Sequence, residues 1–197
     1  MDLLLATRNQ HKVKEVRQLV GDDFRVNDLS AYPTLEMPDE TGATFAENAI
    51  LKATTVSKDR RLRDRFVIAD DSGLEVDALG GAPGIYSARY AGEPASDVAN
   101  IGKLLGELRN IEKRSARFRC VIALTRAGKV LGTFDGAVEG AIVDLPRGKH
   151  GFGYDPIFQP TGFEETFGEM PSDLKNQISH RAKAITVLRT ALRALRS

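Results

Sequence analysis

One segment, residues 66–73, constrains the fold of this chain more than any other, because an apolar run changes there into acidic and small residues. The run Phe66-Val67-Ile68-Ala69 is followed directly by Asp70-Asp71-Ser72-Gly73. Four consecutive apolar residues are typical of a strand that is buried on both faces. In open α/β sheets, ligands bind beyond the carboxyl ends of such strands. We therefore predict a buried strand whose C-terminal end delivers two carboxylates and a hydroxyl to a metal-dependent site.

Length and composition indicate a globular protein with little net charge. The chain has 197 residues, of which 42% are hydrophobic and 28% are charged, and its net charge is +1. This length fits one domain, or two small lobes around a cleft. A nearly neutral chain lacks the long-range field that attracts DNA or anionic membranes, so we expect neither as a partner. A local basic cleft and small anionic ligands remain compatible with this charge.

The cysteine content and the N-terminal residues both favour the cytoplasm. Cys120 is the only cysteine, which excludes an intrachain disulfide and a cysteine-rich zinc site. The N-terminal apolar run, Leu3 to Ala6, is too short for a signal peptide or a membrane span. We therefore expect a cytoplasmic protein.

Apolar strands and amphipathic helices alternate along the chain, which predicts an α/β architecture. After the first strand, capping residues and helical spacing predict four helices. They lie between His11 and Gly21, over residues 44–58, over residues 97–109, and after Ser179, and Val98 and Leu195 are among their expected inward positions. Residues 117–135 predict a hairpin with its turn at 126–129, which argues against an all-parallel sheet. No linker interrupts the pattern, so we expect a single domain over residues 1–197.

The first segment with candidate chemistry is the polar loop that joins the first strand to the first helix. The N-terminus of that helix offers unpaired N–H groups and the positive end of the helix dipole, and Thr7, Asn9 and Lys12 add donors suited to phosphate oxygens. The loop lacks the glycines of a P-loop or of a dinucleotide motif. A capped helix with a solvated basic turn therefore explains it equally well.

The acidic pair and an upstream acidic stretch are the candidate metal ligands. Successive side chains of a strand alternate faces, so we predict that Asp71 faces the cleft and that Asp70 supports the loop behind it. Asp71 could bind Mg²⁺ and accept a proton from water, and Glu40 is a plausible second ligand. Glu36 and Asp39 are the alternatives to Glu40. The competing interpretations are a capped turn for the acidic pair Asp70-Asp71, and a solvated loop for the acidic stretch that contains Glu40.

Two further segments supply groups that could recognise a nucleoside. In Gly151 to Pro156, glycines permit close backbone approach, aromatic rings could stack on a base and an aspartate could bind sugar or base donors. A tight turn with buried aromatic residues is the competing interpretation. Near the final helix, Lys175 and residues 179–181 carry donors for base carbonyls or for phosphate.

Together these segments resemble the inosine triphosphate pyrophosphatase family, the house-cleaning enzymes for non-standard purine nucleotides. The resemblance spans essentially the whole chain, and its longest motif is the run from Leu79 to Gly92, LGGAPGIYSARYAG. The other matching segments are Thr7 to Asn9 with Lys12, Thr44 to Ala49, Ile68 to Gly73, Gly151 to Pro156 and Ser179 to Arg181.

The resemblance implies a Mg²⁺-dependent enzyme that hydrolyses ITP, dITP and XTP to the nucleoside monophosphate and pyrophosphate. It also implies a homodimer of chains with an elongated mixed β-sheet, whose flanking helices form two lobes around a central nucleotide cleft. Asp71 matches the general base and a metal ligand, Glu40 the other metal ligand, and Ser72 a substrate contact. The remaining matches are the phosphate-side residues Thr7, Arg8, Asn9, Gln10, His11 and Lys12, and the nucleoside-side residues Phe152, Gly153, Tyr154, Asp155, Lys175, His180 and Arg181.

The chemistry of the candidate residues agrees with that reaction, and two other interpretations compete with it. Donors at Lys175, His180 and Arg181 suit a 6-oxo purine, whereas adenine presents an amino group there and would leave buried donors unpaired. Position 8 is a departure, since many relatives carry a small residue where this chain has Arg8. The absence of a Ser-x-Ser-Pro-Arg loop argues against the Maf-type pyrophosphatases, the nearest enzymatic rival. A non-catalytic nucleotide-binding protein remains the alternative, and it would not need Asp71 with a second carboxylate.

Overall fold

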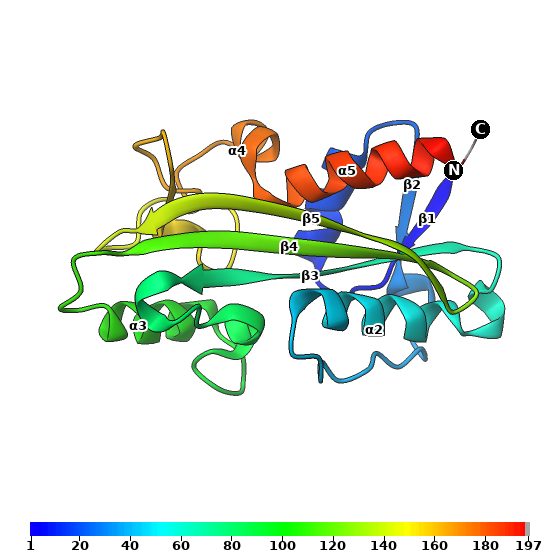
Figure 1. Ribbon diagram of the computed structural model, residues 1–197, viewed down its shortest axis with the longest axis horizontal. Coiled ribbons are helices and arrows are strands. Elements are labelled where there is room, and N and C mark those ends of the chain that lie inside the picture. Colours follow the sequence, from blue (N-terminus) through cyan, green and yellow to red (C-terminus); the bar gives the residue numbers. More distant parts are fainter. Residues whose placement is uncertain (196–197) are drawn as a thin grey trace. The chain divides into compact units, whose positions relative to one another are not determined.

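The computed structural model describes residues 1–195, and it contains a six-stranded mixed sheet with flanking helices (Figure 1). The strand order is β2-β1-β3-β4-β5-β6. The strands are β1 (Asp2–Leu5), β2 (Arg25–Asp28), β3 (Phe66–Val76), β4 (Ser115–Arg126), β5 (Lys129–Ile142) and β6 (Phe158–Pro160). The helices are α1 (Gln10–Val20), α2 (Phe45–Ser57), α3 (Asp97–Glu107), α4 (Ser172–Ile178) and α5 (His180–Ala194).

The pairing of the strands confirms the expected mixed α/β class. β1 pairs in parallel with both β2 and β3, whereas β6 pairs antiparallel with β5. β4 and β5 form the predicted hairpin, whose two turn residues, Ala127 and Gly128, have φ values of 51° and 76°. Two consecutive left-handed residues are the mark of a type I′ turn. None of the helices within residues 1–195 is long and apolar enough to cross a membrane.

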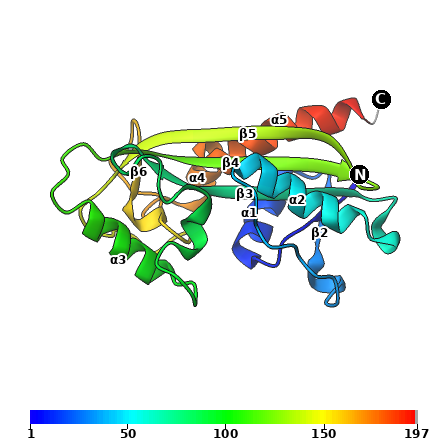
Figure 2. The ribbon, with the colours of Figure 1, turned by 60° about the horizontal axis from the view of Figure 1, so that its bottom comes forward.

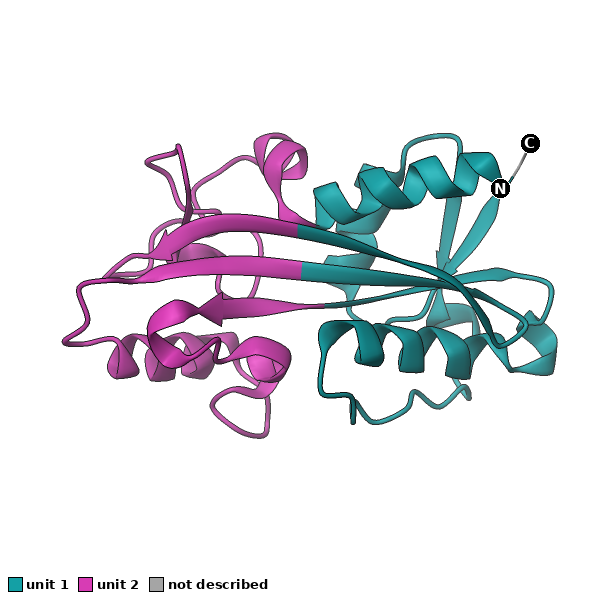
Figure 3. Ribbon diagram, viewed as in Figure 1, with its two compact units in different colours: residues 1–71, 120–136, 181–197 teal, residues 72–119, 137–180 magenta. Residues whose placement is uncertain are grey.

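The chain divides into two compact units (Figure 3). Unit 1 comprises Met1–Asp71, Cys120–Gly136 and Arg181–Ser197, and unit 2 comprises Ser72–Arg119 and Ala137–His180. β3, β4 and β5 therefore each contribute residues to both units. The division explains why the sequence shows no linker, since the chain passes between the units within regular secondary structure.

In unit 1, helices cover both faces of the strands (Figure 1, Figure 2). α1 and α5 pack on the face that carries Leu3, Leu5 and Ile68, in one buried apolar cluster. α2 lies against the opposite face, where Thr125 of β4 donates a hydrogen bond of 3.0 Å to the carbonyl of Ala53. Buried strands with helices on both faces need apolar residues at every position, which accounts for the unbroken apolar run before Asp70.

The helix termini in unit 1 follow the sequence signals. Thr44 caps α2 by accepting the N–H of Glu47, and the Glu47 carboxylate in turn accepts the N–H of Ala43. Asn9 caps α1, and Gly21 ends it with a φ of 76°. The capping box is thus confirmed, with its carboxylate reaching one residue farther back than the standard pattern.

Unit 2 has its own core, and one predicted core position in each unit is wrong. α3, the β3 to β5 segments of this unit and the 154–170 region share one apolar cluster. Val98 is 81% exposed, because α3 turns Asn100 inward, where its amide hydrogen-bonds the backbone of Ala88 and Ala91. Leu195 is 51% exposed, because it lies beyond Ala194, where α5 ends.

Candidate functional site

The acidic pair lies in the middle of β3, because the strand continues from Phe66 to Val76. This corrects the prediction that the carboxylates stand at the C-terminal end of the strand. The strand can continue because each buried carboxylate finds a cation on its own face of the sheet. The predicted alternation is confirmed, since Asp70 contacts α1 and α5 while Asp71 contacts α2.

Asp70 is held in a buried ion-pair network on the face covered by α1 and α5. Its Oδ2 lies 3.0 Å from Lys12 Nζ and 3.0 Å from Arg181 Nη2. Arg181 is 1% exposed, and its other terminal nitrogen is paired with Glu15. Burial alone would raise the pKa of Asp70, but Lys12 and Arg181 outweigh it and hold that pKa well below its ordinary value. In the same way the two carboxylates raise the pKa of Arg181 against the effect of burial.

Asp71 shares a single ammonium group with a second acid on the α2 face. Lys52 Nζ lies 2.8 Å from Asp71 Oδ1 and 2.8 Å from Glu40 Oε1. Asn48 donates a hydrogen bond of 3.3 Å to Asp71 Oδ2. Burial raises the pKa of Asp71, with Lys52 opposing and Glu40 adding to the shift. The carboxylates raise the pKa of Lys52 although burial opposes them, so its ammonium stays protonated.

The two faces of β3 differ in how their ion pairs are arranged. On the α1 and α5 face, Asp70 pairs with Lys12 and Arg181, and Arg181 also pairs with Glu15. On the α2 face, the carboxylates of Asp71 and Glu40 converge on the ammonium group of Lys52. Two carboxylates brought together at one point are a donor set that Mg²⁺ accepts when waters and phosphate oxygens complete its shell. No group of three or more His, Cys, Asp or Glu suited to a metal occurs among the described residues.

The loop before α1 is internally ordered. Thr7 Oγ1 accepts the N–H of Asn9, and Asn9 Oδ1 accepts the N–H groups of His11 and Lys12. Two of the helix N–H groups that we expected to be unpaired are thus capped by the loop itself. Gln10 and His11 are exposed at the start of α1. Arg8 donates hydrogen bonds to the carbonyls of residues 33 and 35.

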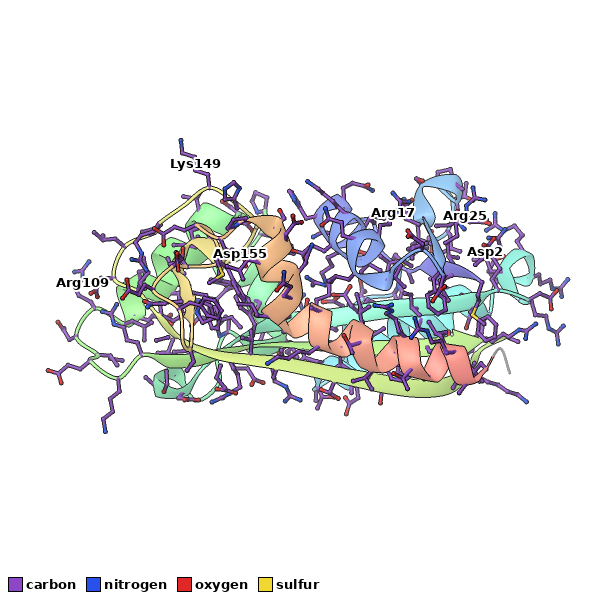
Figure 4. The ribbon with its side chains drawn as sticks, turned by 90° about the horizontal axis from the view of Figure 1, so that it is seen from above. Asp2, Arg17, Arg25, Arg109, Lys149 and Asp155 are labelled. Atoms are coloured by element: carbon purple, nitrogen blue, oxygen red, sulfur yellow. The ribbon has the colours of Figure 1, made fainter. Side chains whose placement is uncertain are left out.

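In unit 2, Asp155, labelled in Figure 4, joins Phe152 of its own turn to Lys175 of α4. Asp155 Oδ2 accepts the N–H of Phe152 at 2.8 Å and lies 2.6 Å from Lys175 Nζ. The ammonium also lies 5.5 Å from the centre of the Phe152 ring. Gly151 has a φ of 75°, and a Cβ there would come within 1.9 Å of Asp155 Oδ2. The turn therefore requires glycine and fixes both the cation and the aromatic ring.

Three other residues predicted on the nucleoside side, Gly153, Tyr154 and His180, are held within unit 2, whereas Arg181 belongs to unit 1. Tyr154 is 4% exposed, and its hydroxyl donates to the carbonyl of Ser87 at 2.9 Å. Gly153 donates its N–H to Asp97 at 2.7 Å. The His180 ring stacks on Phe118 with a centroid distance of 4.8 Å. For Tyr154 the placement fits the competing interpretation, a turn with a buried aromatic residue.

The structure thus collects the predicted residues into two groups, one in each unit. The unit 1 group contains Lys12, Glu40, Asp70, Asp71 and Arg181, whereas Phe152, Asp155, Lys175 and His180 belong to unit 2. Ser72 follows Asp71 as the first residue of unit 2.

Sequence reasoning missed Glu15, Asn48 and Lys52. A signal for two of them was present, because Asn48 and Lys52 stand four residues apart within the buried stripe of α2. Polar side chains at such positions need buried partners, here Asp71 and Glu40.

Comparison with known proteins gives a consistent result. A sequence model of the Ham1 family matches residues 3–191. A Bacillus subtilis protein named dITP/XTP pyrophosphatase is 49% identical over 196 residues, which cover 98% of each chain. A Bacillus licheniformis protein of the same name is 48% identical over 197 residues, or 97% of each chain.

Solved structures agree over nearly the full length. The Staphylococcus aureus Ham1 protein superposes with a TM-score of 0.87 at 45% identity, covering 98% of this chain and 99% of its own. A nucleoside-triphosphatase, dITP/XTP pyrophosphatase, from Mycobacterium abscessus gives a TM-score of 0.76 at 39% identity, covering 95% and 98%.

Proposed function

Because the chain belongs to the Ham1 family, we propose that it hydrolyses non-standard purine nucleoside triphosphates, namely ITP, dITP and XTP. The products are the nucleoside monophosphate and pyrophosphate. Relatives that share nearly half of its residues over their whole length carry the name dITP/XTP pyrophosphatase, which supports this substrate class.

The observation that carries the proposal is the pair of carboxylates gathered around Lys52. Asp71 and Glu40 come from different segments, yet both lie 2.8 Å from the same ammonium nitrogen. Carboxylate oxygens are ligands that Mg²⁺ prefers in proteins, and Asp71 and Glu40 would hold Mg²⁺. When bound, Mg²⁺ supplies positive charge to the phosphate oxygens.

Different residues of unit 1 act on the attacking water and on the departing pyrophosphate. Asp71, whose pKa burial raises, accepts the proton of the water that attacks the α-phosphorus. Lys12 and the N-terminus of α1 stabilise the negative charge of the departing pyrophosphate. We assign Thr7, Asn9, Gln10 and His11 to the same phosphate-side loop. Arg181 acts here by fixing Asp70, and thereby the position of Lys12.

The residues of unit 2 recognise the nucleoside. Phe152 stacks on the base, and Lys175, oriented by Asp155, donates to the 6-oxygen of the purine. Ser72 and His180 provide further contacts, and Gly153 and Tyr154 shape the turn that carries Phe152. An adenine presents its amino group to the Lys175 donor, and such a mismatch costs about four orders of magnitude in kcat/KM.

We place the enzyme in the cytoplasm, acting as a homodimer, with both units forming one pyrophosphatase domain. The free, buried thiol of Cys120 fits a reducing compartment. The strands shared by the two units support a single domain, since neither unit holds a complete β3, β4 or β5.

A substrate panel tests the proposal. Pyrophosphate release is measured from ITP, dITP, XTP, ATP and GTP, with Mg²⁺ and with EDTA. We expect turnover of the first three substrates only, and only with Mg²⁺. Equal turnover of ATP and ITP would overturn the specificity, and tight nucleotide binding without pyrophosphate release would favour a non-catalytic binding protein.

A further inference from the structure

Arg8 joins two loops of unit 1 that are distant in sequence. Its Nη2 donates to the carbonyl oxygen of Leu35 at 2.8 Å and to that of Pro33 at 3.2 Å, across sequence separations of 27 and 25 residues. One loop is the phosphate-side loop before α1, and the other is the segment 33–40 before α2. A guanidinium carries several N–H donors in a fixed plane, so one side chain can hold two carbonyls at once.

The segment beyond this contact carries one of the two proposed metal ligands. Glu40 follows Leu35 by five residues, and Lys52 holds its carboxylate. Between these two ties the segment borders an open hollow of about 670 Å³, which Arg8 and residues 33–39 line. Glu36 and Asp39 are exposed there, whereas Leu35 is buried. The backbone conformation of residues 33–40 therefore depends on the contact with Arg8 at one end and the contact with Lys52 at the other.

We propose that Arg8 is a positioning residue that fixes the 33–40 segment against the phosphate-side loop, and so holds Glu40 beside Asp71. The proposal rests on the function proposed above and changes the role that the sequence suggested for Arg8. Charge-assisted hydrogen bonds to carbonyls are strong and directional. Arg8 Nη2 donates to two backbone carbonyls, and these two hydrogen bonds assign to it the task of setting the loop.

Two variants of Arg8 distinguish a role in positioning the 33–40 segment from a role in binding the triphosphate. Arg8→Ala removes both hydrogen bonds, and Arg8→Lys keeps the charge but loses the planar fork. Arg17→Ala is the matched control, because Arg17, on α1 of the same unit, also donates to a backbone carbonyl, that of Val26 at 3.1 Å (Figure 4).

The first measurement needs neither metal nor substrate. In Arg8→Ala, amide hydrogen exchange of residues 33–40 should rise about tenfold, as expected when a local opening becomes easier. Arg8→Lys should lie between the wild type and Arg8→Ala, and Arg17→Ala should leave this segment unchanged. Unchanged exchange in Arg8→Ala would overturn the proposal.

The second measurement is steady-state hydrolysis of ITP. In Arg8→Ala the Mg²⁺ concentration for half-maximal rate should rise several-fold, while kcat at saturating Mg²⁺ stays within about twofold and the Ki of pyrophosphate is unchanged. A raised Ki with an unchanged Mg²⁺ requirement would mean that Arg8 contacts phosphate, which overturns the proposal. If the wild type released no pyrophosphate, the proposed function would fall, while the exchange result would still decide whether Arg8 fixes the loop.

Discussion

The two faces of β3 in unit 1 treat adjacent carboxylates in opposite ways. The carboxylate of Asp70 pairs with two cations, Lys12 and Arg181, and Arg181 also pairs with Glu15. The carboxylates of Asp71 and Glu40 meet at one cation, Lys52. Two cations on one buried carboxylate fix its position, whereas two carboxylates at one point are the donor set that a divalent cation accepts. The comparison therefore assigns Asp70 a role in folding stability and Asp71 a role in catalysis. A separate variant tests each role.

The largest expected effect is on turnover in Asp71→Asn. Loss of the general base and of a proposed metal ligand should lower kcat for ITP by about three to four orders of magnitude. The folded state should persist, because the amide matches the carboxylate in shape. Asp22→Asn, which changes an exposed acid of the same unit, should leave kcat unchanged. Turnover near the wild-type value in Asp71→Asn would move the catalytic site elsewhere.

The complementary change, Asp70→Asn, should act on stability first. It removes one of the two carboxylates that pair with the buried guanidinium of Arg181, and breaking such a buried pair costs about 3–5 kcal/mol in the free energy of unfolding. Urea denaturation measures this loss. The control is Asp23→Asn, whose pair with Arg193 is about half exposed and should be worth less than about 1 kcal/mol. Equal stability of both variants would contradict the division between the faces.

A smaller effect, on substrate binding alone, should follow from Phe152→Ala in unit 2. Loss of a base stack costs about 1–3 kcal/mol, so KM for ITP should rise about 5- to 150-fold with little change in kcat. Phe163→Ala is the control, since this half-buried ring of unit 2 packs against the apolar cluster and lies outside the 151–155 turn. An unchanged KM in Phe152→Ala would assign its ring to the core.

Most of the elements follow from the sequence, whereas their partners do not. Apolar period and capping residues predicted α1, α2, α3 and α5, and strand alternation separated Asp70 from Asp71. The short elements β2, β6 and α4 were not predicted, because segments of 4, 3 and 7 residues carry too little periodicity. The end of β3 was misplaced because two adjacent acids resemble a strand terminus until Lys12, Arg181 and Lys52 are seen to neutralise them.

The missed residues share one physical cause. Nothing local in the chain marks Lys52 as the partner of Asp71, because their pairing depends on which face of the sheet α2 covers. The hydrogen bonds of Arg8 were missed for the same reason, since the carbonyls that accept them lie 25 and 27 residues away. Sequence motifs identify candidate residues of the site, whereas tertiary contacts are needed to identify the partners of each residue.

The smallest expected effect tests whether the Asp70 face is closed to solvent. Cys120 lies in the apolar cluster with α1 and α5, and burial raises the pKa of its thiol to about 12. Because burial shields the thiol and the raised pKa leaves only a minute fraction of it ionised, labelling of the native protein by an aromatic disulfide reagent should stay slow throughout the range from about pH 7 to 9. In urea the thiol regains its ordinary pKa near 8.5, so labelling should be fast and should accelerate over the same range. Asp70→Asn should raise the native labelling rate and Asp71→Asn should not, because only the first opens this face. Rapid labelling of the wild type would mean that solvent reaches the Asp70 face, and the contrast between the two faces would then lose its basis.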